Sequence, residues 1–248
     1  MAKDTIALVT GANKGIGYAI ADQLATGHDV TVLLGARDPD KGKRAAENLR
    51  ANGGDVRAIR LDVTDTTSVE EAAALIGGDY GRLDILVNNA GISGNRDGQR
   101  PGRVDLSVVR TVFETNLFGV IAVTEAMLGL LRRSTSARIV NVSSGTGSLT
   151  WMTDPEHYFA SRVPGAAAYP VSKTALNMLS VQYAKALAPD GITVNAIAPG
   201  ACATDFITST NRVITRTAAD GARIAVKLAT KANPPSGGFR DDDGPVPW

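Results

Sequence analysis

Short apolar runs alternate with helical patterns along most of the chain. The runs predict β-strands at about residues 5–10, 30–36, 56–62, 83–91, 137–144 and 192–199. Apolar positions at helical spacing predict helices at about residues 15–26, 39–52, 106–132, 168–188 and 218–229. A further helix opens at Thr66 or Thr67, where Thr67 and Glu70 have the spacing of a capping box. Strands that are almost continuously apolar are buried on both faces. The pattern therefore predicts one α/β domain over residues 1–248, a doubly wound parallel sheet of about seven strands with helices on both faces.

Composition narrows the class of partner. A net charge of +1 on 248 residues gives no electrostatic reason to expect a nucleic acid or membrane partner. Cys202 is the single cysteine, so no internal disulfide is possible and the cytoplasm is the expected location. The N-terminal residues lack the apolar run of a secretion signal. The two histidines, His28 and His157, have no metal-binding spacing, and we expect no metal site.

Three segments have no clear periodicity, namely 93–104, 145–167 and 201–216. They follow the predicted strand ends, or nearly so. Open parallel sheets bind their ligands at the carboxyl ends of the strands. We therefore expect the ligand-binding loops in these segments.

A glycine-rich loop, "TGANKGIG" at residues 10–17, follows the first predicted strand and opens the first helix. Gly11 permits a tight turn, and Gly15 and Gly17 allow the backbone to approach a ligand. Free N–H groups and the helix dipole favour an anion there. The position indicates a dinucleotide pyrophosphate site rather than an ordinary turn.

The end of the second predicted strand bears on the choice between NAD and NADP. An acid at this position would bind the ribose diol, but Ala36 and Arg37 stand here. Arg37 can hold a 2′-phosphate with its planar guanidinium, and Lys14 can add a second positive charge. Asp38, one residue further on, is the counter-argument. The residues favour NADP.

Two further strand ends carry candidate binding residues. Asp62 is suited to meet an adenine amino group with Val63 beneath the ring, although an acid here is equally typical of a helix N-terminus. The sequence "NNAG" at residues 88–91 predicts asparagine side chains that lock the backbone by hydrogen bonds. Gly91 then allows a ligand to come close.

Two stretches place a basic residue four positions after a tyrosine, "YFASR" at 158–162 and "YPVSK" at 169–173. Val163-Pro164-Gly165 ends any helix that begins in the first stretch. The second stretch continues as a helix, so Tyr169 and Lys173 lie on one face. Lysine can favour the phenolate and lower the pKa of Tyr169, whereas arginine stays charged. Tyr169 is therefore the predicted general acid or base.

Three more polar residues accompany this pair. Ser143 and Ser144 follow the fifth predicted strand, where a hydroxyl can hold a substrate carbonyl, although serines are also common in turns. Asn116 interrupts an apolar stripe. It marks either a solvated face or local backbone bond, or a kinked turn that holds a water near the lysine.

Together these residues resemble the short-chain dehydrogenase/reductase family, whose fold is the Rossmann fold, and within it the carbonyl-reductase-like branch. The motifs TGxxxGxG, NNAG, the strand-end serine, YxxxK and "NAIAPG" occur in that order within residues 5–205. The resemblance implies catalytic roles for Asn116, Ser144, Tyr169 and Lys173, with Ser144 rather than Ser143 on the carbonyl. It implies NADP(H) as cofactor, bound by Gly11, Asn13, Lys14, Gly15, Ile16, Gly17, Arg37, Asp62, Val63, Asn89, Ala90, Gly91, Tyr169, Lys173, Pro199, Gly200 and Thr204.

The resemblance implies an NADPH-dependent oxidoreductase that reduces the carbonyl of a small or medium ketone, aldehyde or quinone. Two alternatives stay open: a pathway-specific reductase or dehydrogenase for 3-oxoacyl, polyketide or hydroxysteroid substrates, and a sensor that binds NADP without turnover. Residues 201–216 would act as a lid.

The connection before Tyr169 is longer than is usual in the family, and we place an insertion at about 147–166. Such an insertion favours a monomer or a dimer over a larger oligomer, and the oligomeric state stays open between these. Trp151, Met152, His157 and Tyr158 either line the substrate entrance or pack the insertion down.

Overall fold

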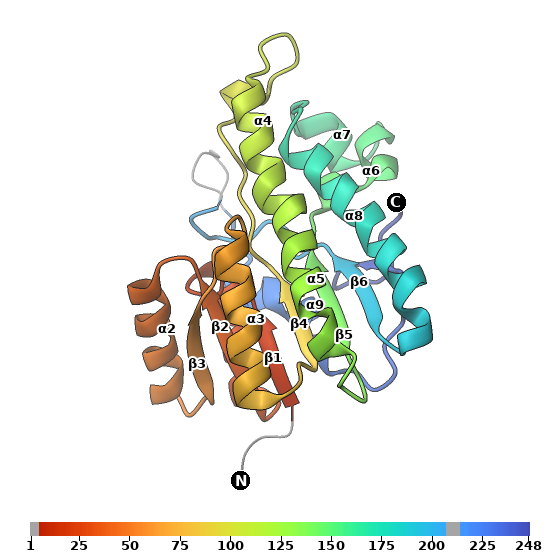
Figure 1. Ribbon diagram of the computed structural model, residues 1–248. Coiled ribbons are helices and arrows are strands. Elements are labelled where there is room, and N and C mark those ends of the chain that lie inside the picture. The colour runs from red at the N-terminus through yellow and green to blue at the C-terminus, as the bar shows by residue number, and fades with distance from the viewer. Residues whose placement is uncertain (1–4, 207–213) are drawn as a thin grey trace.

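The centre of the molecule is one sheet of parallel strands in the order β3-β2-β1-β4-β5-β6-β7 (Figure 1). The computed structural model describes residues 5–206 and 214–248. Within them the strands are β1 (Thr5–Val9), β2 (Val30–Ala36), β3 (Val56–Arg60), β4 (Ile85–Asn88), β5 (Arg138–Val142), β6 (Thr193–Ile197) and β7 (Phe239–Arg240). The order reverses next to β1, as in a doubly wound Rossmann fold, and confirms the predicted fold class.

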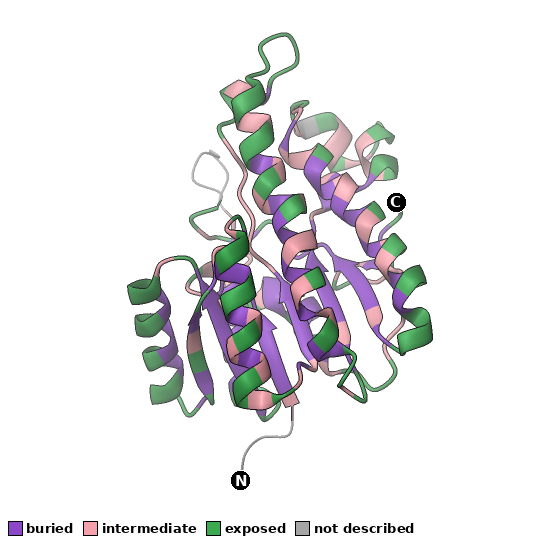
Figure 2. Ribbon diagram, viewed as in Figure 1, coloured by how far each residue is buried: buried purple, intermediate pink, exposed green. Residues whose placement is uncertain are grey.

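Helices cover both faces of the sheet, because successive side chains of each strand point to opposite faces. In β1, Ala7 and Val9 join one core cluster, while Ile6 and Leu8 join the other. Figure 2 shows the resulting buried sheet between half-exposed helices. The first cluster is covered by α1 (Gly15–Gly27), α2 (Pro39–Ala51) and α9 (Ala218–Thr230). The second is covered by α3 (Thr66–Tyr80), α5 (Gly119–Leu131) and α8 (Tyr169–Leu187).

The structure corrects one local prediction and refines another. Helix α3 begins at Thr66, but its cap is Asp65, whose carboxylate accepts a hydrogen bond from Ser68 N at 3.3 Å. The predicted capping box at Thr67 is therefore wrong, since a better acceptor stands two residues earlier. The helix predicted over 106–132 is confirmed as one helical run, Leu106–Leu131, with a π-helical turn inside it. It consists of α4 (Leu106–Phe113), a π-helical turn η2 (Glu114–Phe118) and α5.

The run Leu106–Leu131 is long and apolar enough to cross a membrane by length and composition, with a mean hydropathy of 1.5. In this fold its second half is a core helix. Val123, Met127 and Leu131 of α5 pack into the second core cluster against the sheet. The apolar composition of α5 is thus explained by packing.

The insertion has structure of its own and is held by the C-terminal tail. It contains α6 (Leu149–Thr153) and α7 (Tyr158–Arg162). Thr150 donates hydrogen bonds from its backbone N and its hydroxyl to Trp248 O, at 2.9 and 2.7 Å. Ser148 donates to Pro247 O at 2.6 Å. The tail therefore fixes α6 beside β7, the edge strand.

Candidate active site

The candidate site is built on the carboxyl ends of β1, β4, β5 and β6, which meet at one edge because the strands are parallel. The segments that leave these ends are 10–17, 88–95, 143–147 and 199–206. Helix α8 brings Tyr169 and Lys173 to the same edge, as the next contacts show.

Glycines shape the loop between β1 and α1 for two different reasons. Gly11 and Gly15 have φ angles of +62° and +60°, which residues with a Cβ adopt only with strain. A Cβ on Gly17 would instead lie 2.3 Å from Asn89 Nδ2 and 2.7 Å from Gly11 O. The space beside Gly17 is thus filled by the protein itself. The sequence had suggested instead that a ligand would approach there.

The start of α1 fits a phosphate group. Lys14 precedes the helix in an extended conformation, and no side chain of the described residues caps it. The first turn also contains no acidic residue. Its first N–H groups therefore remain available to an anion that the helix dipole attracts. Asn13 and Ile16 lie in the same loop, both partly exposed.

Asn89 locks this loop to the end of β4. Its Nδ2 donates to Thr10 O at 2.9 Å and to Gly11 O at 3.2 Å. The Thr10 hydroxyl accepts from the backbone N of Asn89 and of Ala90, at 3.0 and 2.9 Å. Asn88 bonds instead to side chains of the core. Of the two asparagines, it is therefore Asn89 that forms the predicted hydrogen bonds to the backbone.

Asn116 lies in the π-helical turn η2 and is fully buried, which rules out a solvated face. Its Oδ1 accepts from Ile92 N at 2.8 Å, and its Nδ2 donates to Ile92 O at 2.9 Å. A Cβ placed on Gly91 would be 3.3 Å from Asn116 Oδ1 and 3.5 Å from Lys173 Nζ. Asn116 and Lys173 therefore meet at Gly91. The water that we expect between them stays a prediction.

The two serines after β5 have different environments. Ser143 is buried and donates to Asn177 Oδ1 at 2.6 Å and to Lys173 O at 3.3 Å. Ser144 lies 3.0 Å from Thr146 Oγ1 and is near enough to the phenol of Tyr169 to lower its pKa. Ser143 thus holds helix α8, and Ser144 is the serine beside the tyrosine.

Burial sets the proton affinities of the tyrosine and lysine. It raises the pKa of Tyr169 to about 12, and the hydrogen bond with Ser144 opposes this only in part. It lowers the pKa of Lys173 to about 8. Lys173 is 4% exposed, donates from Nζ to Val142 O at 2.8 Å and lies 5.9 Å from the Tyr169 ring centre. The expected lowering of the tyrosine pKa is therefore not found, because desolvation is the dominant effect on Tyr169 and Lys173 is not among the groups that oppose it.

The residues expected around a 2′-phosphate differ in whether they form ion pairs within the described residues. Arg37 is exposed and forms no ion pair with any described residue. Asp38 caps α2 by accepting from Lys41 N at 3.1 Å, and it also pairs with Lys41 Nζ at 3.2 Å. These bonds lower the pKa of Asp38. Lys14 pairs with Asp205 at 3.0 Å. Arg37 is thus the cation left for a phosphate, and the acid beside it is already in use.

Asp62 and Val63 take structural positions at the end of β3. Asp62 Oδ1 accepts from Thr64 N at 3.0 Å and from the Thr64 hydroxyl at 2.7 Å, which closes a turn. The acid that caps the following helix is Asp65. Val63 is 9% exposed, and a Cβ on Gly119 would lie 2.8 Å from its Cγ2. Val63 therefore packs mainly on α5.

The turn after β6 is held by an arginine. Gly200 has a φ of +76°, and Arg216 Nε donates to Pro199 O at 2.8 Å. Thr204 lies against Gly15, 3.7 Å from where a Cβ would stand. The turn thus approaches the glycine loop. Of the predicted lid, residues 207–213 lie outside the described residues.

The insertion packs through a cluster of rings. Trp151 stacks on His157 at 4.7 Å, and Phe159 lies 5.9 Å from Trp151. A Cβ on Gly145 would be 2.4 Å from the Phe159 ring. Tyr158 is 39% exposed and Met152 is partly buried. Trp151 and His157 therefore pack the insertion down, next to the segment that carries Ser144.

Two neighbours of Tyr169 were missed by sequence reasoning. The Phe206 ring lies 5.5 Å from the Tyr169 ring and is 40% exposed. Gln99, in the 3-10 turn η1 (Asp97–Gln99), accepts from Tyr169 N at 2.8 Å. The second contact spans 70 residues, and no local pattern indicates it.

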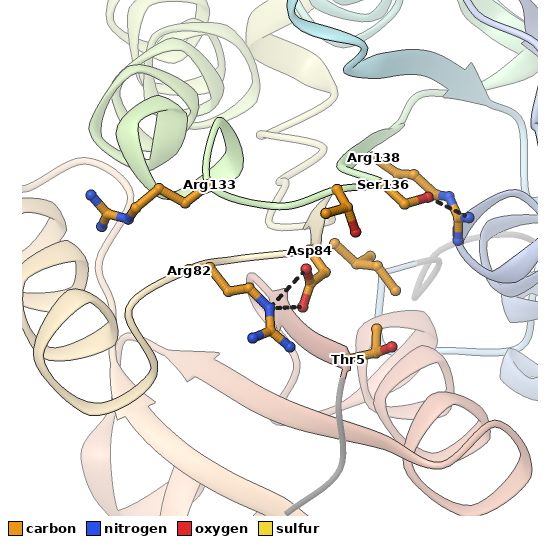
Figure 3. A pocket seen from close by; sticks show the side chains of 8 residues that line it. Thr5, Arg82, Asp84, Arg133, Ser136 and Arg138 are labelled. Carbon is orange, nitrogen blue, oxygen red and sulfur yellow. Dashed lines mark hydrogen bonds and ion pairs between the residues drawn. The ribbon is translucent and has the colours of Figure 1, made fainter.

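A cavity of about 410 Å³ lies elsewhere, at the amino ends of β1, β4 and β5 (Figure 3). Its charged groups bond within the fold. Asp84 accepts from Ile6 N at 2.8 Å and from Arg82 Nε at 3.2 Å. Arg138 donates to Ser136 Oγ at 3.1 Å and to Ala229 O. We interpret this cavity as structural.

Comparison with known proteins shows similarity to short-chain dehydrogenases and reductases over most of the chain. The short chain dehydrogenase family model matches residues 5–214. A short-chain dehydrogenase of Penicillium roqueforti is 36% identical over 232 residues, which cover 92% of this chain and 90% of that protein. A 3-oxoacyl acyl-carrier-protein reductase of Synechocystis is 34% identical over 206 residues, covering 83% and 77%. The NADPH-bound carbonyl reductase from chicken fatty liver superposes with a TM-score of 0.84 at 30% identity, covering 100% of both chains.

Proposed function

The chain belongs to the short-chain dehydrogenase/reductase family, and on this basis we propose that it is an NADPH-dependent carbonyl reductase. Its substrate would be a small or medium ketone, aldehyde or quinone, reduced to an alcohol. The observation that carries the proposal is the buried Lys173, whose Nζ lies 5.9 Å from the Tyr169 ring centre and donates a hydrogen bond to Val142 O, two residues before Ser144. Tyrosine, serine and lysine in this arrangement can polarise and protonate a carbonyl oxygen.

The protonation states suit reduction. With its pKa raised to about 12, Tyr169 keeps its proton at neutral pH and can donate it to the developing alkoxide. Ser144 is placed to donate a hydrogen bond to the same oxygen. Lys173 is mostly protonated at neutral pH, since its pKa is about 8, and its positive charge stabilises the phenolate left on Tyr169.

NADPH would supply the hydride. The uncapped start of α1 fits its pyrophosphate, and exposed Arg37 is suited to its 2′-phosphate. Asp38 is already bonded to the start of α2, which weakens the argument for a ribose-binding acid and NAD. The carbonyl reductase from chicken fatty liver, to which the chain is similar, is NADPH-bound.

A second candidate is a 3-oxoacyl reductase, because the Synechocystis relative has that activity in its name. The same catalytic groups would serve it. The two candidates differ in the substrate that must enter past the insertion, a free carbonyl compound or an acyl chain on a carrier.

The test is NADPH oxidation by the purified protein with a panel of aldehydes, ketones and quinones, and with a 3-oxoacyl thioester. We expect turnover of simple carbonyl compounds. Faster turnover of the thioester would favour the second candidate. Tight NADPH binding without any turnover would overturn the enzyme proposal and support a sensor.

The cofactor proposal is tested by Arg37→Asp. Loss of a charged hydrogen bond to phosphate costs about 1.5–3 kcal/mol, so we expect the KM for NADPH to rise about 10- to 100-fold while that for NADH changes less than about 3-fold. Arg44→Asp, at an exposed position within α2, makes the same change of charge and serves as the control. Equal effects of Arg37→Asp on both cofactors would contradict a phosphate contact.

A further inference from the structure

Gln99 lies in the segment 93–104 that the sequence left without an assignment, yet it is only 2% exposed. Its Oε1 accepts from Tyr169 N at 2.8 Å. Its Nε2 donates to Ser93 O at 2.8 Å and to Asn95 O at 3.0 Å. Its backbone O accepts from Ala167 N at 2.8 Å. Both N–H groups of the amide are therefore used within the loop after β4, and Oε1 joins this loop to the start of α8.

Helix α8 needs such a partner because it has no cap of its own. Residue Ala168 stands at the N-cap position, and its methyl group cannot accept a hydrogen bond. Pro170, the next residue after Tyr169, has no N–H. Gln99 thus supplies from another segment the acceptor that a serine or aspartate usually supplies locally.

A second buried amide holds the other side of the same turn. Asn116 donates to Ser172 Oγ at 3.1 Å, and Ser172 donates to Tyr169 O at 2.7 Å. Asn116 also holds both backbone groups of Ile92. The backbone N and O of Tyr169 are therefore bonded in two directions to one loop, 92–95, through Gln99 and through Asn116 with Ser172.

Gly94 shows that this loop has little freedom. It has a φ of +70°, and a Cβ there would lie 2.6 Å from Val112 Cγ2 and 3.1 Å from Gln99 Nε2. A loop fixed this tightly can transmit its position to Tyr169. Small displacements of a reacting group have large kinetic effects, since about 1 Å can cost about 100-fold in rate.

We propose that Gln99 is a positioning residue, which sets the location of the Tyr169 hydroxyl relative to Ser144 by holding the first turn of α8 against loop 92–95. This rests on the proposed function of Tyr169. The contacts predict an effect on the chemical step rather than on cofactor binding, because the hydrogen bonds of Gln99 within the described residues run to the loop after β4 and to the start of α8, and none of them to the glycine loop.

The principal variant is Gln99→Leu, which keeps the size and removes the hydrogen bonds. We expect kcat for carbonyl reduction to fall about 10- to 100-fold, with the KM for NADPH changed less than about 2-fold. Asn195→Leu is the matched control, because Asn195 is an equally buried amide that bonds to Pro235 O and Gly238 N in the tail. An unchanged kcat in Gln99→Leu, or an equal loss in the control, would overturn the proposal.

Gln99→Glu separates positioning from general stability. The carboxyl keeps an acceptor for Tyr169 N, but when ionised it repels Ser93 O and Asn95 O. Burial raises the pKa of such a glutamate, so its protonated form can donate again at lower pH. We expect the ratio of its kcat to that of the wild type to rise as pH falls from about 9 to about 6. The ratio for Gln99→Leu should stay flat, and a flat ratio for Gln99→Glu would contradict the proposed contact.

Amide hydrogen exchange tests the contact without turnover. The Tyr169 amide should exchange at least about 10-fold faster in Gln99→Leu than in the wild type, because its acceptor is gone. Unchanged exchange would overturn the positioning role. A wild type without carbonyl turnover would instead overturn the proposed function, and the exchange result would stand apart from it.

Discussion

Helices α7 and α8 begin with the same pattern, a tyrosine followed by a basic residue four positions later, yet they present it in different surroundings. Tyr158 opens a helix of 5 residues and is 39% exposed. Tyr169 opens a helix of 19 residues and is partly buried, and Ser144 is among the groups that affect its pKa. Lys173 is buried under it and bonded to β5. Both helices thus carry the motif, and in α8 burial shifts the pKa values of the tyrosine and the basic residue, Tyr169 and Lys173.

The two helices also differ in what holds their first turn. In α7, His157 caps the helix locally, with its Nδ1 accepting from Phe159 N at 3.2 Å. In α8 the acceptor is Gln99, from a distant loop at the ligand edge. A local cap ties α7 only to the insertion, whereas the distant one couples Tyr169 to the loop that faces the site.

The largest expected effect is that of Tyr169→Phe. Removal of the hydroxyl removes the general acid, and we expect kcat to fall about 10²- to 10⁴-fold while the Kd of NADPH changes less than about 3-fold. Steady-state reduction of the best ketone and fluorescence titration with NADPH measure the two quantities. Retention of more than about a tenth of the wild-type kcat would show that another group donates the proton.

Lys173→Met should have the next largest effect, and it acts in opposite directions on activity and stability. Activity should fall because the cation beside Tyr169 is lost. At pH 7 the free energy of unfolding should rise by about 2 kcal/mol, since the shift of the Lys173 pKa from 10.5 to about 8 corresponds to about 3 kcal/mol, less about 1 for the bond to Val142 O.

The sign of the pH dependence checks this explanation. Between pH 8 and 10.5 the unfolded chain binds the Lys173 proton more firmly than the folded chain does, so the wild type gains stability as pH rises. The advantage of Lys173→Met in urea unfolding should therefore shrink from pH 7 to pH 10. An advantage that is the same at both pH values would contradict the lowered pKa.

Helix α8 could be predicted from the sequence because the residues that indicate it are neighbours in the chain. The spacing of Tyr169 and Lys173, the helix that continues after them and the break at Val163-Pro164-Gly165 all lie within one stretch. The sheet was also predictable, since each buried strand is a short apolar run bounded by turn residues.

What the sequence could not show depends on contacts between distant segments. The roles of Gly17 and Asn89 follow from the packing of α1 on the end of β4. The raised pKa of Tyr169 follows from burial by several elements, and the expected lowering by the lysine is not found. Even the cap of α3 was misjudged, because Asp65 and Thr67 are both suitable residues and only the backbone path decides between them.

The smallest expected effect is that of Tyr158→Phe. The Tyr158 ring meets Phe159 edge-on at 5.7 Å, a contact that phenylalanine retains, and the exposed side chain implies a change in stability within about 0.5 kcal/mol. We expect kcat to stay within about 2-fold of the wild type, because Tyr158 is not the proton donor. The kcat/KM for ketones of increasing size should change at most about 3-fold, and only for the larger ones, if α7 borders the entrance. A loss of kcat comparable to that expected for Tyr169→Phe would show that Tyr158 of α7 takes part in proton transfer. The proposed difference between α7 and α8 would then be wrong.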